Sequence, residues 1–139
     1  MRIRTLVLAG LVAAMFAGLA RAADTPEDLA QTAAEAWLKL TDAGDGAASW
    51  EQAARAFKGA VTKEQWMQAL AGVRPPLGKV VSRKLASRQY SEKLPGAPDG
   101  KYVVIRYDTV FANRASAVET ITPMLDADGV WRVSGYFVR

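Results

Sequence analysis

The sequence predicts an α+β domain in which three N-terminal helices pack on one face of a four-stranded antiparallel meander. Three observations indicate this fold class. Helix-start motifs occur only in the first half, the apolar spacing changes from three or four to two after Pro75-Pro76, and turn residues divide the second half into four strand-like segments. The 139 residues suffice for one domain. We place it at residues 23–139, with helices in about 26–72 and strands in about 79–139.

The first 22 residues have the pattern of a cleaved secretory signal. Arg2 and Arg4 precede an uncharged apolar run of 15 residues, Leu6 to Ala20, which ends in Ala20-Arg21-Ala22. A basic start, an apolar middle and a small-x-small end predict cleavage after Ala22. Fifteen helical residues rise about 22 Å, less than the roughly 30 Å hydrocarbon core of a bilayer. We therefore expect no stable membrane anchor after cleavage and a periplasmic or secreted protein.

The first mature helix is expected to begin at Thr25-Pro26-Glu27-Asp28, where Thr25 is the N-cap and Pro26 the first helical residue. The residues at spacings of three and four that should form its buried stripe are Leu29, Ala33, Ala36, Trp37 and Leu40. Gly44 and Gly46 are expected to end it.

Two further helices follow from two capping-box motifs. Ser49–Gln52 predicts a second helix that ends at Gly59, and Thr62–Gln65 predicts a third that ends at Gly72. Pro75-Pro76 is expected to forbid further helix and to separate the two halves of the domain.

Four strands are expected after the prolines. Lys79–Ser91 is a long polar strand, and Tyr102–Ala112 is the clearest alternating one. Val118–Leu125 is the third, and Asp126–Gly129 supplies a hairpin turn to the last. In that last strand, one face should carry Trp131, Val133, Gly135 and Phe137, and the other Arg132, Ser134, Tyr136 and Val138. We expect Trp131 and Phe137 to meet Trp37, Trp50 or Trp66, in a layout similar to cystatin-like or nuclear-transport-factor-like domains.

Composition excludes several kinds of chemistry. The chain has no His and no Cys, so it has no thiolate nucleophile, no Ser-His-Asp triad, no imidazole or thiolate metal site and no disulfide. We expect no cofactor. The signal holds three of the 18 basic residues, which leaves 15 against 14 acidic residues and a net charge of about +1. That balance gives little support to nucleic-acid binding.

Several segments of the mature chain resemble a known family. They are SWEQAARAFKGAVTKEQW (49–66), Pro76-Leu77-Gly78, Ser82-Arg83, LPGAPDGKYVVIRYDTVF (94–111) and ETITPMLDADGVWRVSGYFVR (119–139). Together they are similar to domain-of-unknown-function family 4019 over roughly Ala30 to Arg139. The resemblance implies a small exported bacterial protein without an assigned activity, and it brings no catalytic residues.

Two carboxylates lie within apolar strand segments and are weak catalytic candidates. Burial could raise the pKa of Asp108 or Glu119, and either carboxylate could then act with Tyr107 or Tyr136 as a metal-independent acid–base pair, as in ketosteroid isomerase. The alternative is an ion pair with Arg106 on the exposed face of the sheet. Strand alternation also places the side chains of Asp108 and Tyr107 on opposite faces of the sheet, which weakens the catalytic interpretation.

A basic strand is the weak binding candidate. Arg83, Lys84 and Arg88 could bind an acidic partner, or they could be solvated residues that protect an edge strand from pairing. On a regular strand Arg83 and Lys84 would point to opposite faces.

The sequence therefore favours an exported, non-enzymatic binding or accessory domain for an unknown protein or a small apolar ligand. Its binding surface would be the concave sheet face or the edge near Arg83–Tyr90. The alternatives are an acid–base enzyme with a cone-shaped pocket and a cystatin-like inhibitor of an envelope protease.

Overall fold

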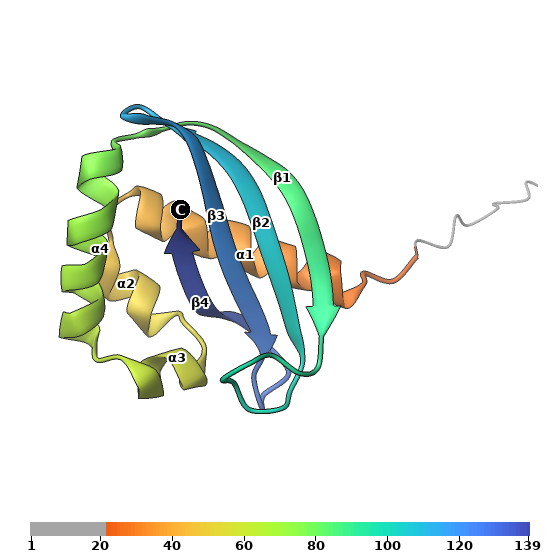
Figure 1. Ribbon diagram of the computed structural model, residues 1–139. Coiled ribbons are helices and arrows are strands. Elements are labelled where there is room, and N and C mark those ends of the chain that lie inside the picture. Colours follow the sequence, from red (N-terminus) through yellow and green to blue (C-terminus); the bar gives the residue numbers. More distant parts are fainter. Residues whose placement is uncertain (1–21) are drawn as a thin grey trace, which may run out of the picture.

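A computed structural model describes residues 22–139 (Figure 1). This part of the chain contains four helices, α1 (Pro26–Asp42), α2 (Gly46–Glu51), α3 (Arg55–Ala60) and α4 (Lys63–Leu77). Four strands follow: β1 (Val80–Ser91), β2 (Tyr102–Phe111), β3 (Arg114–Leu125) and β4 (Trp131–Val138). The α+β class is confirmed. Residues 1–21 of the expected signal lie outside the described part, in which no helix is long and apolar enough to span a bilayer.

The strands form one antiparallel sheet in the order β1-β2-β3-β4, so the predicted meander is confirmed. In Figure 1 helix α1 runs across one face of this curved sheet, and α4 stands beyond β4 at its side. The backbone N–H of Ala54, between α2 and α3, donates to the carbonyl of Val133 in β4 at 2.7 Å. This bond partly covers the β4 edge, whereas β1 forms the other edge of the sheet.

The prediction of one helix starting at Ser49 is wrong, because the segment folds as two short helices. Helix α2 begins three residues earlier, and its N-cap is Asp45, whose carboxylate accepts from the Ala48 N–H at 3.0 Å. Ser49 is fully buried inside α2, where its hydroxyl donates to the Gly46 carbonyl and accepts from the Trp66 indole, at 2.9 and 2.8 Å. A buried indole N–H needs an acceptor, and this serine supplies it.

Both threonine caps are confirmed. The Thr25 side chain accepts from the Asp28 N–H while the Asp28 carboxylate accepts from the Thr25 N–H. Thr62 and Gln65 form the same reciprocal pair at the start of α4. These caps satisfy backbone donors that the first helical turn leaves without partners.

Helix α4 passes both Gly72 and Pro75-Pro76 and ends at Leu77, so the predicted stop is wrong. Proline fixes φ near the helical value and removes one N–H, which costs a helix most where the freed carbonyl is buried. The carbonyls that lose their donors belong to Ala71 and Gly72, and both residues are exposed to water. Gly78 follows as the C-cap, and its φ of +77° is one that glycine adopts without strain.

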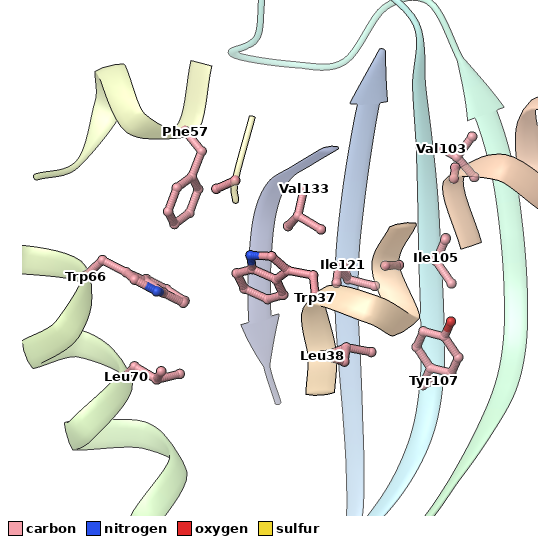
Figure 2. Packing of buried hydrophobic residues seen from close by; sticks show 13 residues of the cluster. Trp37, Leu38, Phe57, Trp66, Leu70, Val103, Ile105, Tyr107, Ile121 and Val133 are labelled. Carbon is pink, nitrogen blue, oxygen red and sulfur yellow. The ribbon is translucent and has the colours of Figure 1, made fainter. Parts of the chain in front are cut away.

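The buried face of α1 is displaced from the predicted stripe. Its buried residues are Ala30, Ala34, Trp37, Leu38 and Thr41, whereas Leu29 is 45% exposed. Figure 2 shows Trp37 at the centre of the core, with Trp66 and Leu70 of α4 on one side and residues of β2 and β3 on the other. Small residues at positions 30 and 34 let the α1 backbone approach the sheet closely, which a leucine would prevent.

Two β-bulges change which side chains face the helices. In β1 the register shifts between Leu85 and Ser87, so Arg83 and Arg88, five residues apart, both lie on the helix face beside Thr109 and Ile105. An odd spacing would place them on opposite faces of a regular strand.

In β4 the register shifts where Thr122 pairs with Gly135 and Pro123 with Val133. The extra residue turns Tyr136 toward the core, where its ring lies 5.4 Å from that of Trp37. Phe137 is 47% exposed, so its predicted core contact is wrong, although Trp131 does pack against the core.

Candidate functional site

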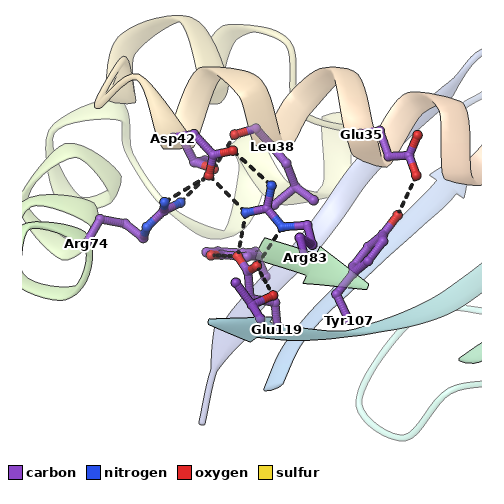
Figure 3. A network of polar contacts seen from close by, with 10 residues as sticks. Glu35, Leu38, Asp42, Arg74, Arg83, Tyr107 and Glu119 are labelled. Atoms are coloured by element: carbon purple, nitrogen blue, oxygen red, sulfur yellow. Dashed lines mark hydrogen bonds and ion pairs between the residues drawn. The ribbon is translucent and has the colours of Figure 1, made fainter. Parts of the chain in front are cut away.

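The only fully buried carboxylate among the described residues belongs to Glu119, on the helix face of β3. It accepts hydrogen bonds from Thr109 Oγ1 at 2.6 Å, from Arg83 Nε at 2.8 Å and Nη2 at 3.2 Å, and from the Tyr136 hydroxyl (Figure 3). Each carboxylate oxygen therefore receives two donors. This satisfies the hydrogen-bonding capacity that burial would otherwise leave unmet.

Arg83 connects Glu119 to a second carboxylate at the end of α1. Its Nη1 and Nη2 atoms each lie 2.9 Å from an oxygen of Asp42, which also binds Arg74 Nη2 at 2.8 Å. Arg74 Nη1 continues the chain to Thr41 Oγ1 at 3.2 Å. In Figure 3 Asp42 lies between the two guanidinium groups. The network thus joins all four strands to α1 and α4, and its two guanidinium groups are paired with two carboxyl groups.

The pKa directions show which groups of this network keep their protons. Burial alone would raise the pKa of Asp42, but the hydrogen bonds from Arg83 and Arg74 outweigh it, and the net pKa is lowered. Burial, together with the charge and hydrogen bond of Glu119, raises the pKa of Tyr136. At neutral pH Asp42 is ionised and Tyr136 is a protonated donor.

The structure separates the four catalytic candidates into different environments. Glu119 and Tyr136 meet, but the buried Tyr107 donates instead to Glu35 at 3.3 Å, and burial raises its pKa. Asp108 and Arg106 are exposed on the other face, as the alternation in β2 predicts. The expected exposed-face ion pair is wrong for Glu119, because β3 points this residue into the core.

The three basic candidates also lie in different environments, two against α1 and one on the outer face of the sheet. Arg83 belongs to the buried network, and Arg88 binds Asp28 at 2.8 Å and Gln31 at 3.1 Å on α1. Lys84 is exposed and, by the β1 register, lies opposite Asp108 on the outer face. The two arginines therefore fasten α1 to the edge strand, and only Lys84 remains on the outer surface.

An open groove adjoins the network where the end of α1 and the start of α2 face α4. We call it the α1–α4 groove; its volume is about 500 Å³. Its walls include Met67, Leu70, Ala71 and Pro75 from α4, and Arg74, Asp42 and Thr41 belong to both groove and network. The remaining lining residues are Ala43, Gly44, Gly46, Gly78 and Lys79.

The groove is not among the sequence-based predictions, although α4 carries a pattern that indicates it. Met67, Leu70, Ala71, Arg74 and Pro75 follow the i, i+3, i+4, i+7, i+8 spacing of one helix face. The predicted helix end at Gly72 leaves Arg74 and Pro75 outside the helix and so hides the continuous face. Met67 is 44% exposed, so part of this mainly apolar face is uncovered.

A second groove of about 530 Å³ lies on the outer face near the β2–β3 turn and includes Lys84, Asp108 and Arg139. Neither groove is lined by Glu119 or Tyr136. The buried carboxylate with its tyrosine therefore has no contact with either open space.

Comparison with known proteins gives one match. A family model described as "Protein of unknown function (DUF4019)" matches residues 33–136, which is most of the chain. No curated protein and no solved structure matches, so the likeness to cystatin-like or nuclear-transport-factor-like domains stays a prediction.

Proposed function

The chain belongs to the family described as proteins of unknown function (DUF4019), and since that description assigns no activity, we propose from the geometry that it is a binding domain. Its ligand is a small apolar molecule that occupies the α1–α4 groove. The observation that carries this proposal is an open groove of about 500 Å³ with mainly apolar walls. Pockets of roughly 300 to 1,000 Å³ with apolar walls and a few polar groups are typical of small-molecule sites.

The residues that form the groove suit such a ligand. Met67 is flexible and partly exposed, and thioether side chains adapt to apolar ligands of different shapes. A Cβ atom on Gly46 would lie 3.2 Å from the Met67 side chain, so glycine permits the close approach of α2 to α4. Behind this wall, Leu70 is buried and joins the groove to the core.

The two alternative functions have less support. An acid–base enzyme would need substrate to reach Glu119, which is fully buried, accepts four hydrogen bonds and lines neither groove. An inhibitor of an envelope protease depends on the predicted cystatin likeness alone.

The proposal includes export, on the basis of the expected signal in residues 1–22. Bacteria that express the full chain should hold the protein in the periplasm or the medium, with an N-terminus at Ala23. A cytoplasmic protein that keeps its leader would refute this part and leave the groove proposal unaffected.

The groove proposal can be tested with the neutral fluorescent probe N-phenyl-naphthylamine and two tryptophan variants of α4. Ala71 is exposed and lines the groove, so Ala71→Trp should fill it and weaken probe binding at least tenfold. Val73 is 44% exposed on the same helix outside the groove, so Val73→Trp is the matched control and should bind as the unmodified protein does. Both variants should unfold at similar urea concentrations.

Two results would refute binding in this groove. One is that the unmodified protein leaves the probe fluorescence unchanged. The other is that Ala71→Trp and Val73→Trp weaken binding equally, which would locate the probe elsewhere.

A further inference from the structure

We propose that the ligand of the α1–α4 groove is a monomeric amphiphile with a carboxylate head, which binds at the end of the groove near Lys79 and Arg74. Its apolar tail lies along Met67 and Leu70. This inference rests on the proposed function and adds the chemical class of the ligand.

The acceptor groups of the groove's polar side chains are already engaged. Both oxygens of Asp42 are taken by three guanidinium N–H groups of Arg74 and Arg83. The Thr41 hydroxyl donates to the Leu38 carbonyl at 2.9 Å and accepts from Arg74. A ligand that offers only hydrogen-bond donors would have to displace these bonds.

The helix ends at the groove are similarly occupied. At the end of α1, the carbonyls of Lys39 and Thr41 accept from the N–H groups of Ala43 and Gly44. At the end of α4, the Gly78 N–H approaches the carbonyls of Arg74 and Pro75, at 3.2 and 3.1 Å. These bonds reduce the negative potential that free carbonyls would otherwise present at a helix end.

The hydrogen-bond donors of the groove's side chains, in contrast, are only partly engaged. Lys79 is exposed and forms no ion pair within residues 22–139. The Nε atom of Arg74 is buried and lacks a hydrogen-bond partner in the same part of the chain, so this guanidinium keeps one unused donor although it is paired with Asp42. The polar capacity that remains is therefore positive, and a carboxylate is the ligand group that complements it.

Calorimetry with three ligands of equal chain length can test this inference. Decanoic acid, decanol and decylamine should be titrated into the full protein as purified, at about pH 8, where the acid is ionised and the amine is charged. We expect the acid to bind roughly tenfold more tightly than the alcohol, because charge-assisted hydrogen bonds are about twice as strong as neutral ones. The amine should bind most weakly.

A lysine variant locates the head group. Lys79→Gln should lower the affinity for the acid to that for the alcohol and leave the alcohol unchanged. The matched control is Lys84→Gln, which removes the same charge from an exposed position on the outer face and should change neither.

The possible failures are distinguishable. If the acid and the alcohol bind equally, or the amine binds most tightly, the inference is wrong and the proposed function stands. If none of the three binds, the proposed function fails with it. Sedimentation with anionic lipid vesicles, without uptake of monomeric acid, would also overturn the inference.

Discussion

Glu119 shows how a single carboxyl group can be kept in the core of this domain. An unpaired carboxylate in such a position would cost several kcal/mol in lost hydration. Arg83 supplies the opposite charge, and Thr109 and Tyr136 supply the remaining hydrogen bonds. The arrangement stabilises the fold only as long as every member is present, because each partner compensates the burial of the others.

Replacing Glu119 should therefore lower the free energy of unfolding substantially. Glu119→Gln should lower the free energy of unfolding by about 3 kcal/mol, since it leaves the mostly buried guanidinium of Arg83 with one carboxylate instead of two. Urea unfolding monitored by circular dichroism measures this change. Asp108→Asn alters an exposed carboxylate on the neighbouring strand and should cost less than about 0.5 kcal/mol. Equal costs for the two variants would contradict the structural role of the network.

At the residue scale, the sequence indicates members of the network but not how they assemble. Glu119 and Tyr136 are candidates because they are polar groups in apolar strands. Their partner Arg83 is predicted separately, as a surface charge. Its contact with Asp42 joins residues that are 41 positions apart. It also depends on how α1 lies across the sheet, which the local spacing of residues does not predict.

At the scale of elements, the sequence predicts those features that depend on hydrogen bonds between residues close together in the chain, such as helix caps. Thr25 and Thr62 cap helices because their partners lie three residues away, and each pair is visible in the sequence. Helix faces and strand faces were less predictable. A three-or-four spacing fits both Leu29 and Ala30, and only the close approach of α1 to the sheet selects the alanine. A bulge inserts one residue and reverses every face after it, as at Tyr136 and Phe137.

The end of β4 provides a test of that reversal. Deletion of Tyr136–Arg139 removes a core aromatic ring, a donor to Glu119 and three register pairs with β3, so it should cost several kcal/mol, a large share of a typical 5–15. Phe137→Ala should cost less than about 1 kcal/mol, because this ring is nearly half exposed. Thermal unfolding of both variants measures the difference. If Phe137→Ala were as unstable as the truncation, Phe137 would have to be a core residue, and this result would refute the bulge.

At the scale of the whole molecule, the lack of histidine gives stability a simple dependence on pH. No side-chain type in the chain has an ordinary pKa between about 5 and 8, so the free energy of unfolding should be nearly constant over that range. On the acid side, hydrogen bonds from Arg88 and from Thr25 lower the pKa of Asp28 to about 2. On the alkaline side, burial raises the pKa of Tyr107 and of Tyr136 above the ordinary 10.0.

The signs of these shifts determine the two limits. A lowered carboxyl pKa stabilises the fold above its ordinary value, so stability should fall as the pH drops from about 4 toward 2. A raised tyrosine pKa stabilises the fold fully below pH 10.0, so stability should fall as the pH rises beyond it. Urea unfolding at a series of pH values measures both limits, and Arg88→Gln should make the acid decline shallower. A transition between pH 6 and 8 would contradict the assignment of the titrating groups.

The position of α1 also determines the order in which the chain can complete its core. This helix is the first element of the described chain, yet it packs chiefly against β3 and β4, which are the last. A growing chain therefore exposes Trp37 long before Ile121 and Val133 are there to cover it. The meander can assemble hairpin by hairpin, but α1 stays without its partners until the final strand has arrived. The topology of this domain therefore requires β4 before the core around α1 can be completed.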